Sequence, residues 1–381
     1  MRAWLTASAV LAIGALPCAC PARSHHLHFL KSHRAHVNSS KHSEIAPDIK
    51  PAALWDGRND LDFQAADCPR MVTAANARFL DNNEYVLGLT IHGESRAYPT
   101  RFVAWHHIIN DKVGLPEWGP QQPVAITYCV VCNTGIRFDP IVDGKPVKFD
   151  FYGLYNGVVT MIDRDTHSVW LQVGGRAVKG RRVGATLKTG PLLDTTWAEW
   201  KALHPDTLVM APVKGFEDAY EPREPPFERG LGEFPQAYFR KTITHWDHRL
   251  AEFEMVLAVS SPRNAQTGAR IYRAYPLKTI RRLGVVNQPL GDAQIAVLCD
   301  PATATATVVN RELDGKVLTF ELRKENGKAL FVDRETGTRW SVEGHALAGP
   351  LAGKSLRRLN SCLSEWYGWS AYFPQTQIFH I

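Results

Sequence analysis

Two cysteines three positions apart, Cys129 and Cys132, are the residues of this sequence best suited to chemistry. A Cys-x-x-Cys pair brings two thiols close enough to chelate one metal ion or to form a reversible disulfide. The residue directly after Cys132 is not histidine, which excludes covalent haem attachment through a C-x-x-C-H motif. The flanking residues, Ala125–Tyr128 and Ile136–Phe138, are typical of strands, whereas a thioredoxin-like site needs its first cysteine at a helix N-terminus.

A metal site needs further ligands, and His106 is the strongest third candidate because it lies shortly before the cysteines. Two thiolates, an imidazole and a thioether suit copper(I) or zinc. The alternatives for Cys129 and Cys132 are a redox-active dithiol and a structural disulfide between two strands. For His106 the alternative is a histidine whose hydrogen bonds are satisfied within the core. The weaker candidate ligands are His107, Met161 and His167.

The signatures of several other classes are missing. The sequence contains no H-E-x-x-H, P-loop, G-x-G-x-x-G or G-x-S-x-G motif, so no nucleotide cofactor is expected. Its 44 basic and 38 acidic residues give a net charge of +6, which is spread along the chain. Nucleic-acid-binding proteins usually gather such charge on one face, so we expect no nucleic-acid partner.

Most of the elements that must position these side chains are predicted to be strands. Short runs of β-branched and aromatic residues predict four of them, at Pro123–Tyr128, Lys145–Tyr152, Gly157–Ile162 and Ser168–Val173. The Asp-Gly pairs at 143–144 and 314–315 predict hairpin turns. A helix is predicted over Thr100–Asp111, and a capping box formed by Thr196 and Glu199 predicts a second.

An internal repeat organises the chain. The sequence Arg-Ala-Tyr-Pro at 96–99 recurs at 273–276, and Asp163-Arg164 is matched by Asp333-Arg334. Further matches follow in the same order, and they include two pairs of tryptophans that we expect in the core, Trp197 and Trp200 with Trp366 and Trp369. An ordered series of this length predicts two copies of one structural unit.

We therefore predict an α+β, β-rich fold made of two tandem copies of one mostly antiparallel β unit, each with a few short helices. A lead-in segment spans 51–84, and the first copy, with the Cys/His site, spans 85–212. A Pro- and Gly-rich connector, 213–254, leads to a degenerate second copy at 255–381. In that copy Cys299 aligns with Cys129, but nothing replaces the second cysteine, and Leu283-Gly284 stands opposite His106-His107.

The N-terminus carries the parts of a secretory signal. A basic start, an apolar stretch at Leu5–Leu16 and small residues at Cys18–Cys20 predict a signal peptide over 1–20. Residues 21–50 are rich in histidine and lack apolar periodicity, which predicts a disordered arm. We expect a periplasmic or extracellular protein with no membrane span in the mature chain. A lipid anchor at Cys18 or Cys20 is a less favoured alternative.

Taken together, these motifs resemble the bacterial family called domain of unknown function 3179. The resemblance covers about 85 to 380 and rests on Arg96–Pro99, Trp105-His106, Ile109–Asp111, Thr127–Cys132 and Asp163–Trp170. The family pattern reads His-Glu where this chain has His106-His107, and Cys-Pro-Leu-Cys where it has Cys129-Val130-Val131-Cys132. The resemblance implies an exported protein with a cysteine-centred site, and it implies no settled reaction.

The resulting hypothesis is an exported protein that binds a soft metal, copper or zinc, at Cys129, Cys132 and His106 in a redox or metal-handling role. The first alternative is a thiol-disulfide oxidoreductase that uses the two cysteines. The second is a non-enzymatic binding module in which their disulfide is structural. The expected partner is an unidentified small molecule or a protein thiol.

Overall fold

The computed structural model describes residues 44–221, 237–325 and 328–381. Strands make up 42% of it and helices 13%, so the fold is β-rich, as predicted. The predicted signal peptide and residues 21–43 of the predicted arm lie outside the described residues. Residues 44–50, which the prediction included in the disordered arm, are ordered: Ala46 and Ile49 are buried, and the Ala46 N–H donates to the Val178 carbonyl.

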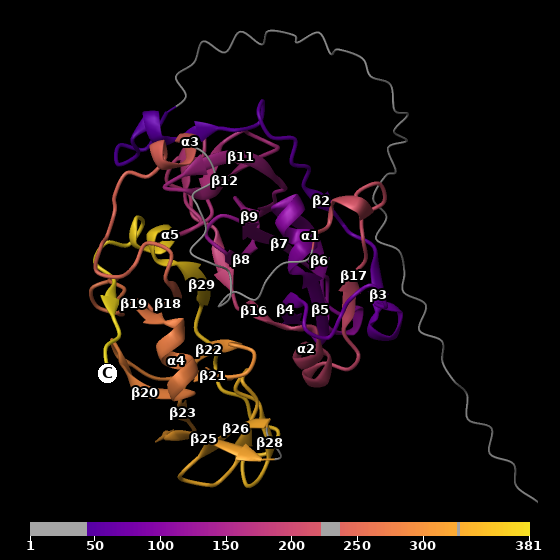
Figure 1. Cartoon of the computed structure of the whole chain (residues 1–381), viewed down its shortest axis with the longest axis vertical. Helices are drawn as coiled ribbons and strands as arrows, with labels where there is room; N and C mark the ends of the chain where they lie inside the picture. The colour runs from indigo at the N-terminus through magenta and orange to yellow at the C-terminus, as the bar shows by residue number, and fades with distance from the viewer. Residues whose placement is uncertain (1–43, 222–236, 326–327) are drawn as a thin grey trace, which may run out of the picture. The chain divides into compact units, whose positions relative to one another are not determined.

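Three five-stranded sheets and one two-stranded hairpin are built from residues 55–210, drawn in indigo to magenta in Figure 1. The first sheet, in the order β16-β4-β5-β17-β3, contains β3 (Met71–Thr73), β4 (Tyr85–Ile91), β5 (Glu94–Pro99), β16 (Leu193–Thr196) and β17 (Leu208–Met210). The second, β15-β8-β7-β6-β2, contains β2 (Ala66–Asp67), β6 (Ile108–Val113), β7 (Gln122–Cys129), β8 (Thr134–Asp139) and β15 (Lys188–Gly190). The third, β1-β11-β12-β13-β14, contains β1 (Trp55–Asp56), β11 (Phe149–Tyr155), β12 (Val158–Asp163), β13 (Val169–Leu171) and β14 (Ala177–Lys179). The lead-in segment thus supplies one edge strand to each sheet.

Residues 255–378 form three sheets of three or four strands and one two-stranded hairpin, drawn in orange to yellow. The first, β29-β18-β19-β30, contains β18 (Met255–Ser260), β19 (Tyr272–Pro276), β29 (Ser361–Glu365) and β30 (Gln377–Ile378). The second contains β20 (Val285–Leu290), β21 (Ala293–Cys299) and β22 (Ala306–Asn310). The third contains β25 (Phe320–Glu325), β26 (Lys328–Asp333), β27 (Arg339–Trp340) and β28 (Ala346–Ala348). Apart from β15 and the three lead-in strands, the strand order of each sheet matches that of its counterpart in residues 85–210.

The Asp-Gly hairpins are found where the sequence predicts them. They join β9 (Ile141–Val142) to β10 (Lys145–Pro146), and β23 (Glu312–Leu313) to β24 (Lys316–Val317). Both residues of each turn have positive φ, 51° and 73° in the first and 49° and 77° in the second, as a type I′ turn requires.

Each half has a helix directly after its Arg-Ala-Tyr-Pro strand. These are α1 (Thr100–His106) and α4 (Leu277–Leu283). The helix predicted over Thr100–Asp111 is therefore too long, because His107 adopts a φ of 57° and the chain then enters β6. The connector contributes α3 (Ala237–Lys241). None of the helices within the described ranges is long and apolar enough to cross a membrane.

Two further helices begin with the predicted tryptophans, α2 (Trp197–Leu203) and α5 (Trp366–Ser370). The N-cap half of the predicted capping box is confirmed, since the Thr196 hydroxyl accepts the Glu199 N–H at 3.3 Å, but the Glu199 carboxylate accepts from threonine hydroxyls instead of closing the box. The second tryptophan of each helix donates its indole N–H to the hydroxyl of a threonine that follows the helix. Trp200 Nε1 donates to Thr207 and Trp369 Nε1 donates to Thr376, at 2.9 and 3.0 Å.

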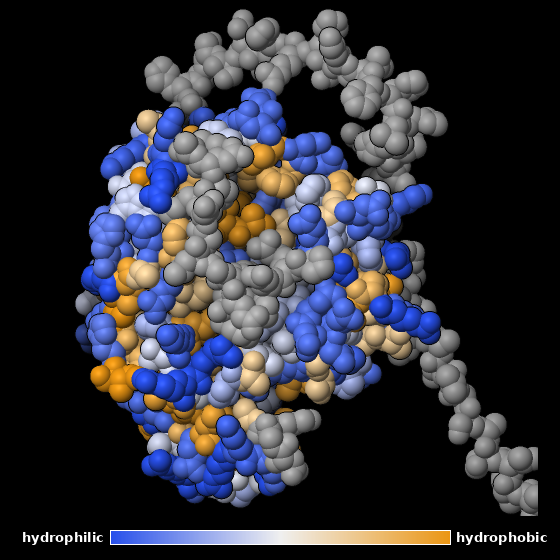
Figure 2. All heavy atoms as spheres, viewed as in Figure 1, coloured by the Kyte–Doolittle hydropathy of each residue, from blue (hydrophilic) through white to orange (hydrophobic). Residues whose placement is uncertain are grey.

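All four tryptophans are buried, as predicted, in cores that are completed by the strands around them. On the face shown in Figure 2, hydrophobic residues lie in small groups between hydrophilic ones.

The two halves meet through α2 and α5, each of which packs on a turn of the other half. In α2, Glu199 accepts hydrogen bonds from Thr303 and Thr305, next to the turn between β21 and β22. In α5, Gly368 lies against Cys132, in the turn between β7 and β8. The cysteine turn is therefore closed by the C-terminal half of the chain.

Candidate functional site

The Cys-x-x-Cys sequence forms the turn of an antiparallel hairpin. Strand β7 ends at Cys129, which pairs with Thr134 at the start of β8, and Val130–Asn133 form the turn between them. Asn133 closes it with a φ of 52°, a conformation that asparagine tolerates better than most residues. The predicted strand on each side of the pair is confirmed, and neither cysteine lies at a helix N-terminus.

The turn brings the two thiols together. Cys129 and Cys132 come within 3.0 Å of each other, both are reduced, and both side chains are fully buried. The Cys132 thiol also donates to the Thr134 hydroxyl at 3.2 Å. The two side chains are therefore close enough to form a disulfide or to bind one ion together.

The surroundings of the pair shift the pKa values of the two thiols in opposite directions. Burial alone would raise the pKa of Cys129. However, hydrogen bonds from the Cys132 thiol and from the backbone N–H groups of Cys132, Val159 and Val131 outweigh it, so the pKa of Cys129 is lowered. Burial, reinforced by the neighbouring Cys129 sulfur, raises the pKa of Cys132 well above its ordinary value. Of the two thiols, Cys129 is therefore the one that ionises first as pH rises.

The wall over the pair comes from the end of β29 and from α5. A Cβ atom at Gly368 would lie 2.8 Å from the Cβ of Cys132, so only glycine allows this approach without a shift. The Glu365 N–H donates to the Cys132 carbonyl at 2.9 Å, and the Asn133 amide donates to the Glu365 carboxylate at 2.9 Å. Burial, together with the charge of the two cysteines, raises the pKa of Tyr367 well above its ordinary value.

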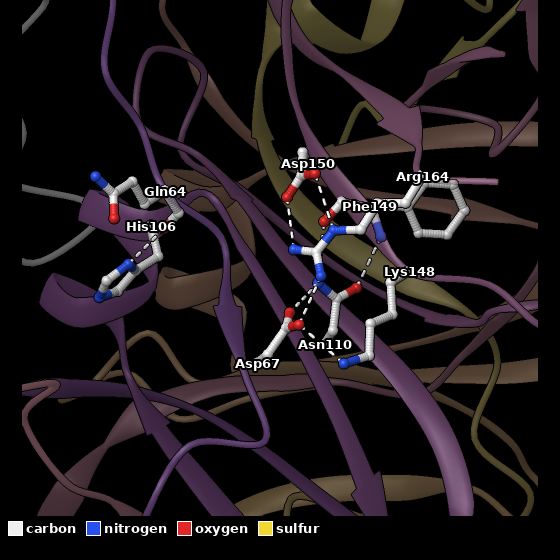
Figure 3. A network of polar contacts seen from close by, with 8 residues as sticks. All are labelled: Gln64, Asp67, His106, Asn110, Lys148, Phe149, Asp150 and Arg164. Atoms are coloured by element: carbon white, nitrogen blue, oxygen red, sulfur yellow. Dashed lines mark hydrogen bonds and ion pairs between the residues drawn. The ribbon is translucent and has the colours of Figure 1, made fainter. Parts of the chain in front are cut away.

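His106 lies in α1 and contacts Gln64 of the lead-in segment (Figure 3) and Tyr220 of the connector. Its Nδ1 lies 2.6 Å from the Gln64 carbonyl oxygen and its Nε2 lies 2.7 Å from the Tyr220 hydroxyl. Burial lowers its pKa, although the Gln64 carbonyl opposes this, and the neutral ring then donates through Nδ1 and accepts at Nε2. Both nitrogens are therefore engaged away from the cysteines.

The weaker candidates are dispersed. His107 Nδ1 lies 2.9 Å from the Tyr128 carbonyl oxygen, and its ring stacks on Phe151 with centroids 5.4 Å apart. Met161 is buried in a different cluster, with Trp170, and His167 is exposed in the turn between β12 and β13. Throughout the part of the chain that the structure describes, no three His, Cys, Asp or Glu side chains are grouped so that they could hold a metal ion.

The strand register corrects the alignment of Cys299 with Cys129. The Tyr128 N–H donates to the His107 carbonyl, and the Cys299 N–H donates to the Gly284 carbonyl, each at 2.8–2.9 Å. Cys299 therefore takes the place of Tyr128, and Asp300 that of Cys129. The positive φ of Ala304, 56°, corresponds to that of Asn133, which places Thr303 opposite Cys132. The C-terminal half thus lacks both thiols of the pair.

Sequence analysis missed Asp67, which lies next to Cys68 in the lead-in segment (Figure 3). Its carboxylate accepts from Lys148 at 2.8 Å, from Arg164 at 2.6 Å and from Asn110 at 2.9 Å. Burial raises its pKa, but these three donors outweigh that and lower it. Arg164 also pairs with Asp150 at 2.6 Å. Nothing in the sequence around Asp67 indicated that it would accept these three hydrogen bonds, since its partners are 43 to 97 positions away.

Fold and site together define a β-rich protein with a buried, polarised dithiol on a hairpin turn. The chain belongs to the family described as protein of unknown function (DUF3179), whose model matches residues 62–376. No curated protein and no solved structure matches it.

Proposed function

We propose that this protein carries out thiol–disulfide exchange through Cys129 and Cys132. The observation that carries the proposal is the pair itself: two reduced thiols within 3.0 Å, one with a lowered pKa and the other with a raised one. A lowered pKa increases the fraction of the attacking thiol that is ionised at a given pH, and a nearby second thiol resolves the intermediate.

The exchange consumes an external disulfide, R–S–S–R. The Cys129 thiolate attacks one sulfur of that disulfide, the S–S bond breaks, and R–S⁻ leaves and takes a proton. Cys132 then gives up its proton and attacks the Cys129 sulfur of the mixed disulfide, which expels the second R–S⁻. The two cysteines are oxidised to one disulfide, and one R–S–S–R is reduced to two R–SH.

Burial sets a condition on this reaction. Both sulfurs are fully enclosed, so an external disulfide reaches Cys129 only when the wall formed by Glu365 and α5 opens. Small disulfides of the glutathione type need less opening than folded proteins do, and they are the substrate class that we assign.

Copper or zinc binding at the same two thiols is the second candidate, favoured by their convergence on one point. His106 could serve as a third ligand only after its ring leaves Gln64 and Tyr220. The third candidate is a binding module whose Cys129–Cys132 disulfide is purely structural.

One experiment separates the three candidates. The chain is purified without oxygen, and its metal content and thiol count are measured before and after addition of oxidised glutathione. Exchange predicts a metal-free protein that loses the thiols of Cys129 and Cys132 and regains them with reduced glutathione. Stoichiometric copper or zinc that disappears in Cys132→Ser would support the metal site instead. A disulfide that stays closed and only raises the melting temperature would support the binding module.

We also propose that the chain is exported and that its two halves arose by duplication. The sequence of residues 1–20 supports export, which is tested by N-terminal sequencing of the protein recovered from the periplasm or medium. Duplication is supported by the matching strand orders and by the Trp–Thr bonds common to α2 and α5. It predicts that in an experimental structure the backbone of 85–210 superimposes on that of 255–378. Halves that do not superimpose would contradict it.

A further inference from the structure

A cleft separate from the cysteine pair lies between the two halves. Its floor is formed by β8 and β15 on one side, and by β18, the loop that follows it and residues 357–362 on the other. The more enclosed part has a volume of about 410 Å³ and the more open part about 570 Å³, and the two share much of their lining. Volumes of this size are typical of sites for small organic molecules. Neither Cys129 nor Cys132 lines the cleft.

The lining is strongly cationic. The only carboxylate among the lining residues is Asp139, and it pairs with Arg137 and, at 3.6 Å, with Lys188. The side chains of Arg263 and Arg270 bond only to carbonyl and hydroxyl oxygens within the described residues. The positively charged residues of the cleft are Arg137, Lys188, Arg263, Arg270, Arg357 and Arg358. This excess of positive charge in a concave site favours an anionic ligand.

Two of these arginines are built into the cleft rather than lying on its surface. Arg137 is 7% exposed, and its guanidinium occupies space left by Gly190, where a Cβ atom would lie 2.1 Å from Nη1. Arg358 is held by Glu343 at 2.8 Å. The Nε atoms of Arg137 and Arg358 are both buried without a hydrogen-bond partner in the described part of the chain. Since buried donors are normally satisfied, each of these guanidinium groups keeps one N–H donor without a partner although it is ion-paired through another nitrogen.

The inner end of the cleft is aromatic. Tyr272 and Phe373 stack with ring centroids 4.1 Å apart and planes 16° apart, and Trp369 packs on Phe373 at 4.6 Å. All three line the enclosed part, together with Ile136 and Leu192. A ligand that fits both ends therefore has an oxyanion group and an apolar, preferably planar, body.

We propose that this cleft binds a small aromatic anion that carries a phosphate or carboxylate group. The oxyanion lies against Arg137, Lys188 and Arg270, and the ring lies against Tyr272 and Phe373. Guanidinium and ammonium groups are the donors that recognise both kinds of oxyanion. The site does not depend on the redox chemistry of the cysteine pair, so either proposal can fail alone.

Isothermal titration calorimetry of the full chain with four probes tests the proposal: phenyl phosphate, benzoate, inorganic phosphate and phenol. At least one aromatic anion is expected to bind about tenfold more tightly than both phenol and inorganic phosphate, because only it contacts both ends of the cleft. Tighter binding of phenyl phosphate assigns a phosphate ligand, and tighter binding of benzoate assigns a carboxylate.

The exposed residues Arg263 and Arg270 provide variants that should leave the fold intact. The double variant Arg263→Ala/Arg270→Ala is expected to weaken binding of the preferred anion about tenfold, since it removes charge-assisted contacts. The matched control is Arg181→Ala, an exposed arginine outside the cleft, which should bind as the parent protein does. Absence of saturable binding for both aromatic anions, or equal binding by the double variant and the parent, would overturn the proposal.

Discussion

Cys129 differs from the other buried cysteines in the donors that face its sulfur. Burial raises the pKa of Cys299 and of Cys362 to about 12, because no comparable set of donors offsets the loss of solvation. Around Cys129 three backbone N–H groups and a second thiol reverse that effect. The lowered pKa therefore comes from the hairpin turn itself, which aims its own amides at the first cysteine of the motif.

Removal of one thiol should trap the intermediate of exchange. We expect Cys132→Ser treated with oxidised glutathione to accumulate a mixed disulfide at Cys129, because the thiol that would resolve it is gone. Cys129→Ser should remain largely unmodified at Cys132, since burial, the largest cause of its raised pKa, is unchanged in this variant. Intact-mass spectrometry measures both adducts. Equal modification of the two variants would show that the pair is not polarised.

The pH dependence of the same reaction reports the thiolate directly. A lowered pKa means that the thiolate fraction of Cys129 rises through a midpoint below the ordinary cysteine value of 9.0 as pH increases. The rate at which Cys132→Ser forms its mixed disulfide should follow that curve between about pH 5 and pH 9. A midpoint above 9.0 would contradict the assignment of Cys129 as the attacking group.

At the scale of elements, α5 and the β7–β8 turn act as one unit. The backbone of α5 at Gly368 touches Cys132, and Glu365, which precedes the helix, bonds to both Cys132 and Asn133. The corresponding contact on the other side of the molecule is made by Glu199 of α2 with Thr303 and Thr305. Threonine hydroxyls meet the helix in that contact, whereas here the backbone of Gly368 lies directly against Cys132.

Gly368→Ala should therefore loosen the cover of the dithiol. Its Cβ would lie 2.8 Å from the Cβ of Cys132, and overpacking of this kind costs about 1–3 kcal/mol, more than the gain of about 1 kcal/mol in helix propensity. We expect a lower free energy of unfolding in urea and faster reaction of the parent cysteines with a small disulfide.

The control for this variant lies in the same helix. Ser370→Ala removes a hydroxyl that is buried without a partner among the described residues, so it should leave both the free energy of unfolding and the reaction rate close to those of the parent. If Gly368→Ala matched Ser370→Ala in both measurements, α5 would not be the element that controls access.

At the scale of the whole molecule, a buried ionic chain also joins the two halves. Glu343 accepts from His204 Nε2 at 2.6 Å and from Arg358 at 2.8 Å, and Ser95 contacts His204 Nδ1 at 3.0 Å. Burial would raise the pKa of Glu343, but the hydrogen bond from His204 and the charges of Arg358, His204 and His345 outweigh it and lower the pKa.

This linkage predicts acid sensitivity. Because the folded-state pKa of Glu343 is lowered, its contribution to stability is complete above the unfolded value of 4.5 and is lost as pH falls below it. Glu343→Gln should lower the free energy of unfolding at neutral pH by about 3 kcal/mol, since it leaves Arg358 buried without its charge partner. It should also flatten the decline of stability between about pH 5 and pH 3. Urea denaturation across this range is the measurement, and an unchanged slope would remove Glu343 from this role.

The features that the sequence predicted well are local. The hairpin signals, the N-cap at Thr196 and the strands around Cys129 and Cys132 each depend on residues close together in the chain. The environment of the site could not be predicted, because its wall at Gly368 and the partners of His106, Gln64 and Tyr220, are brought in by tertiary packing. The misplaced Cys299 has the same origin: a shift of one residue changes a strand alignment completely, and only the backbone hydrogen bonds fix it.

The most direct test of a reversible Cys129–Cys132 dithiol is a redox titration of the intact protein. The chain is equilibrated in buffers with graded ratios of reduced to oxidised glutathione and quenched in acid. It is then unfolded and alkylated, and its mass is measured by mass spectrometry. We predict one two-electron transition that involves Cys129 and Cys132 and disappears when either is replaced by serine. Thiols at these two positions that stay reduced, or a disulfide that stays closed, over the whole range would contradict the account.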